Sequence, residues 1–356
     1  MPFCHGKCSY CAFYSLGRYG RAEQEAYIRH ILQDMEKQSD GCAALRSIFI
    51  GGGTPTALDD DLFEKLLSGI RNNFRFSDNM EWTVESNPES LLEQKIAIMA
   101  SHGVTRVSMG IQSFDPRIRT VLGRCGHLEG LEAKVDALRK AGICHVNFDF
   151  IYNVPSQRPE DFRMDLQKAL QLKPDHVSTY ALTIEEGTPL AAHGTCVNDD
   201  DFPEYWRLAD EILAEGGLSR YEISNFAKPG CECRHNNDIW HGGTYLGIGP
   251  AASSFDGMDR WTQVYNLPKW LDGEWADMDI LPSDVRDAEV LAFGMRTVDG
   301  WTWRQFEETV GVDAKVLRGK ELARLERLGL VTIDDNGFRP TARGLLFNNE
   351  IVMDLL

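Results

Sequence analysis

The sequence lacks the features that mark membrane, secreted and nucleic-acid-binding proteins. It contains no run of about 18 apolar residues, so no membrane-spanning helix is expected. Its start, Met1-Pro2-Phe3-Cys4, has neither the basic region nor the apolar region of a signal peptide. Lys and Arg number 37 against 54 Asp and Glu, a net charge of −17, so the basic excess of a nucleic-acid binder is missing. We therefore expect a cytoplasmic protein with no nucleic-acid partner and no transmembrane segment.

The cysteines also lack the pattern of a disulfide framework. There are nine of them, an odd number, and three lie close together at Cys4, Cys8 and Cys11. Small disulfide-stapled domains of secreted proteins normally carry an even number of cysteines. Metal ligation in a reducing compartment is therefore the better interpretation.

The order of strand and helix patterns predicts an α/β fold. Apolar strand-like segments alternate with amphipathic helical segments, which predicts parallel strands joined by helices. The strands are expected at 47–50, 81–85, 106–112, 144–152 and 176–182. One helix is expected to start with a capping box formed by Ser90 and Glu93. Five such units in a row predict a (β/α) barrel, open or closed, with its chemistry at the carboxyl ends of the strands.

The pattern changes after about residue 220, which predicts three segments. Residues 1–220 are expected to form the barrel domain. Residues 221–282 contain Cys, His and Gly-rich loops and read as a connecting segment. Residues 283–356 show helical patterns followed by a short strand pair, which predicts a small α+β, winged-helix-like domain.

The most specific signal is the spacing Cys4-x3-Cys8-x2-Cys11. Fe–S clusters are usually held by Cys thiolates, and a [4Fe–4S] cluster needs four ligands. Ala12 and Phe13 follow in place of a fourth cysteine, so one iron would be open to a ligand from outside the protein. The alternatives are buried thiols or a zinc site, but zinc motifs usually pair two such groups and no second pair sits at suitable spacing.

This cysteine loop resembles that of the radical S-adenosylmethionine (SAM) superfamily. The resemblance implies a [4Fe–4S] cluster on the three cysteines, with the amino and carboxylate groups of SAM on the open iron. It also implies that an electron from a low-potential donor, such as flavodoxin or ferredoxin, cleaves SAM to methionine and a 5′-deoxyadenosyl radical. Tyr10 matches the aromatic residue that packs near the adenine in that family.

Further motifs match positions that bind SAM in the same superfamily. Gly52, Gly53 and Thr54 belong to a Gly-Gly-Gly-Thr-Pro run that follows a predicted strand, and glycine allows the backbone to approach a ligand closely. Such a run is by itself often an ordinary turn. Four polar residues at or after strand ends match contacts to the methionine and ribose parts of SAM, although each one alone would suit a surface or capping role: Glu85, Gln112, Arg124 and Asp149.

Three passages resemble the coproporphyrinogen oxidase-like branch of the superfamily, namely residues 147–157, 176–189 and 221–250. That branch contains the oxygen-independent coproporphyrinogen III oxidases and the heme chaperones of the HemW type. Phe13 stands where the oxidases carry a further cysteine, and the long N-terminal extension of the oxidases is missing, which favours the chaperones. Relatives also have a strand before the cysteine loop, so we expect a partial (β/α)6 barrel whose first strand is missing.

The resemblance implies a heme ligand in the passage His235-Asn236-Asn237-Asp238-Ile239-Trp240. Imidazole is a common axial ligand of heme iron, so His235 is the candidate, with a structural histidine as the alternative. Cys231 and Cys233 are nearby alternative thiolates. The expected function is binding heme and delivering it to a recipient heme protein. The alternatives are SAM-dependent oxidative decarboxylation of coproporphyrinogen III and a reaction on another tetrapyrrole.

Overall fold

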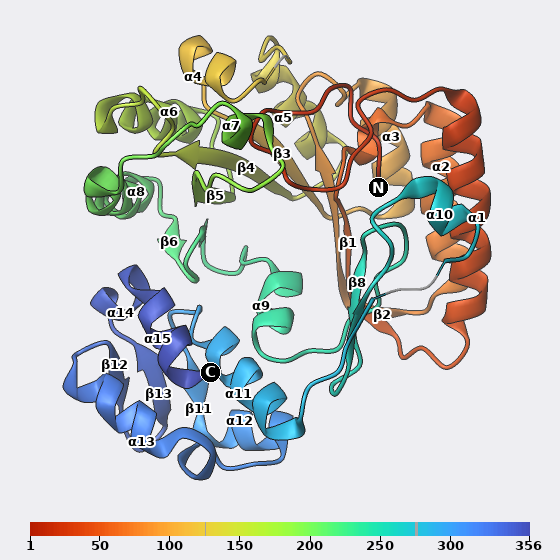
Figure 1. Ribbon diagram of the computed structural model, residues 1–356. Coiled ribbons are helices and arrows are strands. Elements are labelled where there is room, and N and C mark those ends of the chain that lie inside the picture. Colours follow the sequence, from red (N-terminus) through yellow and green to blue (C-terminus); the bar gives the residue numbers. More distant parts are fainter. Residues whose placement is uncertain (125, 275–276) are drawn as a thin grey trace.

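The computed structural model describes residues 1–124, 126–274 and 277–356. Its main element is a seven-stranded sheet with the order β1-β2-β3-β4-β5-β7-β6, which curls into a half-barrel (Figure 1). The five predicted strands are present and parallel, and β7 and β6 extend the sheet in antiparallel pairing. The strands are β1 (Leu45–Ile50), β2 (Phe76–Ser86), β3 (Arg106–Gln112), β4 (His145–Tyr152), β5 (His176–Ala181), β6 (Ser219–Arg220) and β7 (Asn225–Ala227). In the described residues no strand precedes β1 in the sheet, as expected for a partial barrel.

Helices precede, connect and follow the five parallel strands, and the longer ones pack on the apolar face of the sheet. They are α1 (Arg21–Ser39), η1 (Pro55–Ala57), α2 (Asp60–Asn73), α3 (Glu93–His102), α4 (Pro116–Val121), α5 (Leu131–Lys140), α6 (Pro159–Gln171), α7 (Pro189–Ala192), η2 (Asp199–Asp201) and α8 (Phe202–Glu215). The capping box predicted at Ser90 is wrong, because α3 begins after Leu92 and its cap makes no side-chain hydrogen bond. Instead, the Ser90 hydroxyl lies 2.6 Å from Thr56 Oγ1, where it ties the loop after β2 to η1.

The two faces of the sheet differ in chemistry because successive side chains of a strand point to opposite sides. One face is apolar and packs against the helices through Ile50, Trp82, Val84, Val107, Met109, Val146, Phe148 and Val177. On the other face, strand pairing places polar residues side by side: Ser47, Glu81, Thr83, Glu85, Arg106, Ser108, His145, Asn147, Asp149, His176 and Ser178. The inner side of the half-barrel is therefore polar and charged.

The connecting segment crosses this inner side. It contains α9 (Arg234–Trp240), α10 (Leu267–Leu271) and an antiparallel sheet of β8 (Ser253–Phe255), β9 (Arg260–Thr262) and β10 (Asp277–Asp279). Figure 1 shows α9 between the curved sheet and the C-terminal elements. Since β7 of this segment pairs with β5, the segment also completes one edge of the main sheet.

The C-terminal part has a second hydrophobic core around Leu291, Trp301, Phe306 and Phe338. Its elements are α11 (Ser283–Gly294), β11 (Trp301–Thr302), α12 (Trp303–Val310), α13 (Ala314–Arg327), β12 (Val331–Ile333), β13 (Gly337–Pro340), α14 (Ala342–Leu346) and α15 (Asn348–Leu355). Helices packed on a three-stranded antiparallel sheet that contains the β12–β13 hairpin match the expected winged-helix-like arrangement. The exact division into three segments stays a prediction. Of the helices that the structure describes, none is long and apolar enough to cross a membrane.

Candidate functional site

The cysteine loop is fixed by backbone hydrogen bonds to three separate parts of the chain. Cys4 N donates to Leu16 O at 3.0 Å, and Ser9 N donates to Leu122 O at 2.9 Å, just after α4. Leu190 N of α7 donates to Ser9 O at 3.0 Å. Figure 1 shows this N-terminal coil, in deep red, running beside α7. The fold therefore holds the three cysteines as a defined loop.

The three cysteines are free thiols with different exposure. Cys8 is buried, whereas Cys4 and Cys11 are half-buried. Burial raises the pKa of both Cys4 and Cys11, and hydrogen bonds to the sulfur oppose the shift in each case. In the described part of the chain, no three His, Cys, Asp or Glu residues are gathered around the place of a single metal ion. A cubane cluster does not require such a gathering, because each thiolate binds a different iron.

The glycine-rich run meets the segment just before Cys4. Gly53 N donates to Met1 O at 2.6 Å, and Thr54 N donates to Phe3 O at 2.7 Å. A Cβ at Gly53 would lie 2.5 Å from Phe3 O, and Gly52 has a φ of +103° that favours glycine. These glycines therefore let the two backbones pair, a role that the sequence alone did not indicate.

A chain of polar contacts links two of the cysteines. Thr54 Oγ1 lies 3.5 Å from Cys4 Sγ and accepts a hydrogen bond from Asn87 Nδ2 at 2.9 Å. Arg124 donates from Nη2 to Asn87 Oδ1 and from Nη1 to Cys8 Sγ, the latter at 3.5 Å. Asn87 was missed by the sequence analysis, and the available signal was its place two residues after Glu85 in the same polar passage.

Glu85 and Asp149 place two carboxyl groups on the inner face at the carboxyl ends of their strands. Glu85 accepts a hydrogen bond from Gly52 N at 3.2 Å, and burial together with the charge of Asp149 raises its pKa to about 7. Asp149 accepts from Ser108 Oγ at 3.0 Å and from Asn147 Nδ2 at 2.7 Å, and burial raises its pKa too. Such a pair suits a ligand that brings a cationic amino group and hydroxyl groups.

Gln112 and Tyr10 flank this region. Gln112 ends β3 with a φ of +68°, where the pairing of β3 with β4 slips by one residue. Strained backbone of this kind is often found at functional sites. The Gln112 side chain hydrogen-bonds to no other residue that the structure describes, which leaves its amide free for a ligand. Tyr10 packs against the apolar cluster that contains Leu122 and Leu190. Its pKa is raised mainly by burial and, to a smaller extent, by the nearby Cys8.

The candidate heme ligand His235 lies apart from these residues, on α9 against β1. Its Nδ1 is 3.0 Å from Ser47 Oγ, and its ring stacks on Phe49 with centroids 5.2 Å apart. Its backbone N donates to Glu81 Oε1 at 3.1 Å. Burial lowers the pKa of His235, so the imidazole is held neutral. The structure thus gathers the cysteines and the candidate SAM residues at one end of the half-barrel and places His235 nearer the other end.

A buried polar network, also missed by the sequence analysis, fills the inner side near His235. Glu81 pairs with Arg106 at 3.0 Å and accepts from Cys233 Sγ at 3.5 Å. His176 bonds through Nδ1 to Asn147 Oδ1 at 2.7 Å and through Nε2 to the Tyr221 hydroxyl at 2.8 Å. The same hydroxyl accepts from Cys233 N at 3.2 Å. Cys233 is therefore a structural part of this network.

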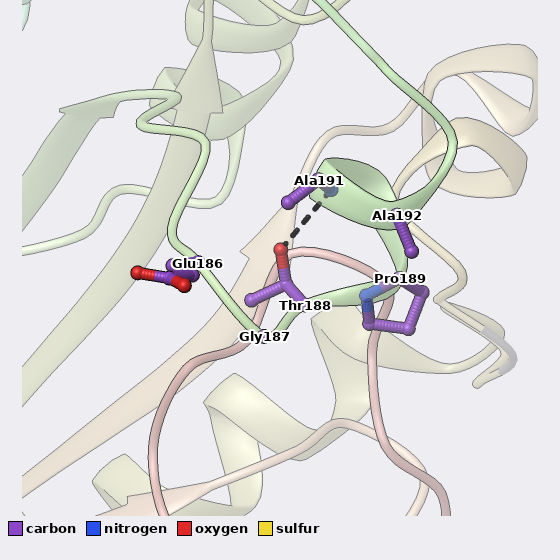
Figure 2. A pocket seen from close by; sticks show the side chains of 6 residues that line it. All are labelled: Glu186, Gly187, Thr188, Pro189, Ala191 and Ala192. Carbon is purple, nitrogen blue, oxygen red and sulfur yellow. Dashed lines mark hydrogen bonds between the residues drawn. The ribbon is translucent and has the colours of Figure 1, made fainter.

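A separate hollow lies at the start of α7 (Figure 2). Thr188 caps that helix by accepting a hydrogen bond from Ala191 N at 3.3 Å. The lining residues are Glu186, Gly187, Thr188, Pro189, Ala191 and Ala192, of which only Glu186 is ionisable. The same helix bonds to the cysteine loop through Leu190, but none of the candidate cofactor residues lines the hollow.

Comparison with known proteins agrees with this geometry. Residues 1–169 match the radical SAM superfamily, and residues 281–347 match the HemN C-terminal domain. The heme chaperone HemW of Mycobacterium tuberculosis is 34% identical over 388 residues, covering 100% of this chain and 93% of its own length. The heme chaperone HemW of Haemophilus influenzae is 30% identical over 365 residues, covering 99% and 95%.

Among solved structures, coproporphyrinogen III oxidase (HemN) of Escherichia coli, a radical SAM enzyme, shares the fold. Its TM-score is 0.83 at 23% identity, and the match covers 100% of this chain and 88% of that one. Membership of the radical SAM superfamily implies a [4Fe–4S] cluster and SAM as cofactors, and the three thiols that the described part of the loop supplies are a donor set that fits such a cluster. The chain belongs to the HemW family of the radical SAM superfamily.

Proposed function

We propose that this protein is a cytoplasmic heme chaperone that binds heme and passes it to a recipient heme protein. The full-length similarity to HemW proteins supports the function, and the setting of His235 is the structural observation that carries the heme part of it. A SAM-bound [4Fe–4S] cluster would be its resident cofactor, on Cys4, Cys8 and Cys11.

The cluster would supply an electron-transfer centre with one open iron for SAM. Arg124 and Thr54 would hold the loop in place, since each contacts a cysteine sulfur. For SAM we propose Tyr10 beside the adenine, Gly52, Gly53, Thr54 and Glu85 at the amino group, and Gln112, Arg124 and Asp149 at the carboxylate and ribose. Two observations support this assignment: Glu85 keeps some exposure, and the Gln112 amide has no hydrogen-bond partner among the described residues.

His235 has the setting of a metal-ligating imidazole. A ligating histidine usually engages its second ring nitrogen in a hydrogen bond that fixes the tautomer and the ring orientation. Here Ser47 Oγ engages Nδ1, and Phe49 fixes the ring plane. Nε2 has no hydrogen-bond partner among the residues that the structure describes, and the lowered pKa keeps its lone pair available.

The proposed function is tested by anaerobic heme titration of the cluster-reconstituted protein, followed at the Soret band. We expect one heme per chain in the wild type and binding weakened about tenfold or more in His235→Ala, because loss of an axial ligand removes a metal bond. His193→Ala is the matched control, since His193 is exposed and its Nδ1 hydrogen-bonds to Pro189 O of the neighbouring α7.

Equal heme affinity in wild type and His235→Ala would reject His235 as the ligand. Absence of any specific heme binding would reject the chaperone proposal. In that case, formation of protoporphyrinogen from coproporphyrinogen III would be assayed, because the fold is shared with the oxidase.

A further inference from the structure

The N-terminal loop is basic, whereas the chain as a whole is acidic. Residues 1–22 contain Lys7, Arg18 and Arg21 but no Asp or Glu, whereas the whole chain carries a net charge of −17. Arg21 is neutralised by ion pairs to Glu25, Asp59 and Asp61. Lys7 and Arg18 form no ion pair with any residue in the described part of the chain. The N-terminal loop therefore carries two uncompensated positive charges on a protein that is acidic overall.

The backbone segments that carry these two residues are in contact, within the cysteine loop. A Cβ at Gly17 would be 3.3 Å from Lys7 N, so the backbone before Arg18 runs against the backbone of Lys7. Lys7 directly precedes Cys8 in the chain, so its backbone is part of the cysteine loop itself. Both Lys7 and Arg18 are exposed.

A large apolar side chain completes the surface. Phe13 is 71% exposed, and its backbone N–H hydrogen-bonds to Cys11. Phe13 thus belongs to the same exposed loop as Lys7 and Arg18, and aromatic residues and Arg are enriched at protein-binding surfaces. We name Lys7, Phe13 and Arg18 the basic loop patch.

We propose that the basic loop patch is the docking surface for an acidic one-electron donor protein that reduces the cluster. The proposal rests on the proposed function only in requiring a cluster on Cys4, Cys8 and Cys11. One electron leaves the reduced donor and enters the oxidised cluster, so the donor is oxidised by one electron and no bond is made or broken. Complementary charge would steer an acidic donor to this site rather than to the acidic remainder of the protein.

The experiment measures the rate at which the reconstituted cluster is reduced by an acidic flavodoxin in its hydroquinone form. In Lys7→Glu/Arg18→Glu we expect this rate to fall about tenfold or more at low ionic strength, with the difference shrinking as salt is added. Reduction by photoreduced deazaflavin, a small neutral reductant, should stay within about twofold of the wild type, since it needs no charged docking site. Iron and sulfide content is measured in every sample.

The matched control is Lys140→Glu/Lys320→Glu, which makes the same change in net charge at two exposed lysines outside the loop. An equal loss of rate in the control, or an unchanged rate in the patch variant, would overturn the proposal. A change in oligomeric state of the patch variant with an unchanged flavodoxin rate would also overturn it and assign the patch to a second copy of the chain. If the charge reversal lowers the iron content, Lys7→Gln/Arg18→Gln replaces it under the same criteria. A wild-type protein that takes up no cluster would refute the proposed function instead.

Discussion

Asn87 Oδ1 accepts a hydrogen bond from Arg124 Nη2. This contact joins the side chains that hydrogen-bond to Cys4 and to Cys8 into one network. Arg124 reaches Cys8, and Asn87 reaches Cys4 through Thr54. The residues come from the loop after β1, the loop after β2 and the loop after α4. The cysteine loop is thus held by side chains from three consecutive β/α units.

Asn87→Ala should loosen the cluster without unfolding the protein. The variant removes one hydrogen-bond partner from Arg124 and one from Thr54, which lowers the free energy of unfolding by about 1–3 kcal/mol. Arg124 keeps its bond to Gly110 O at 2.7 Å. We expect iron to be lost to a chelator several-fold faster than from the wild type. Asn349→Ala, at an exposed position of α15, is the control, and equal iron-loss rates in all three proteins would disprove the role of Asn87.

Gly110→Ala should disturb the same hydrogen-bond network, because the added methyl group would be too close to Arg124 and Gln112. A Cβ at Gly110 would lie 2.8 Å from Arg124 Nη2 and 2.9 Å from Gln112 Nε2. Overpacking of this kind costs about 1–3 kcal/mol, and we expect weaker SAM binding by calorimetry together with faster iron loss. Gly319→Ala is the matched control, since its nearest neighbour would be an ordinary contact at 3.8 Å. SAM affinity as high in Gly110→Ala as in the control would contradict the crowding argument.

Glu85 should make the stability of the apoprotein fall with rising pH. Its pKa is raised from an ordinary value of 4.5 to about 7, first by burial and then by Asp149. The folded state therefore binds the proton more tightly, so the contribution is fully present below pH 4.5 and is lost as the pH rises through about 7. Urea unfolding at about pH 5 and about pH 8 should show a smaller drop in Glu85→Gln than in the wild type. An identical drop would mean that Glu85 does not titrate in this window.

Tyr221→Phe should destabilise the inner network. The variant leaves His176 Nε2 and Cys233 N without their shared partner in a buried setting, which costs about 1–3 kcal/mol. The free energy of unfolding in urea measures this cost. Tyr265→Phe, at a tyrosine that is 65% exposed, should change it by less than about 0.5 kcal/mol. Equal values for the two variants would show that the Tyr221 hydroxyl does not stabilise the fold.

The large elements were predictable from sequence because their signals are local. The five parallel strands carry apolar residues at regular positions between turns and helical segments, and β3 is found over the predicted residues 106–112. The strands β6 and β7 have only two or three residues. They form through long-range pairing, β7 with β5 and β6 with β7, so no local sequence pattern predicts them. The capping box failed for a related reason, since Ser90 has a better partner in Thr56, 34 residues away.

The same distinction holds for the site. The cysteine spacing and the glycine run are compact motifs that a sequence displays directly. The links made by Asn87, and the path from Tyr221 through His176 to Asn147, join residues far apart in the chain. They follow from the register of neighbouring strands, which a single sequence does not reveal.

The most direct test of the account is the iron and sulfide content after anaerobic reconstitution of Cys4→Ala, Cys8→Ala and Cys11→Ala, with Cys196→Ala as an exposed control. The wild type and Cys196→Ala should each contain about four irons and four sulfides per chain, which is the composition of one [4Fe–4S] cluster. Each of the three loop variants should lose the cluster. Full iron and sulfide content in any of these three would contradict the central claim that this loop holds the cluster.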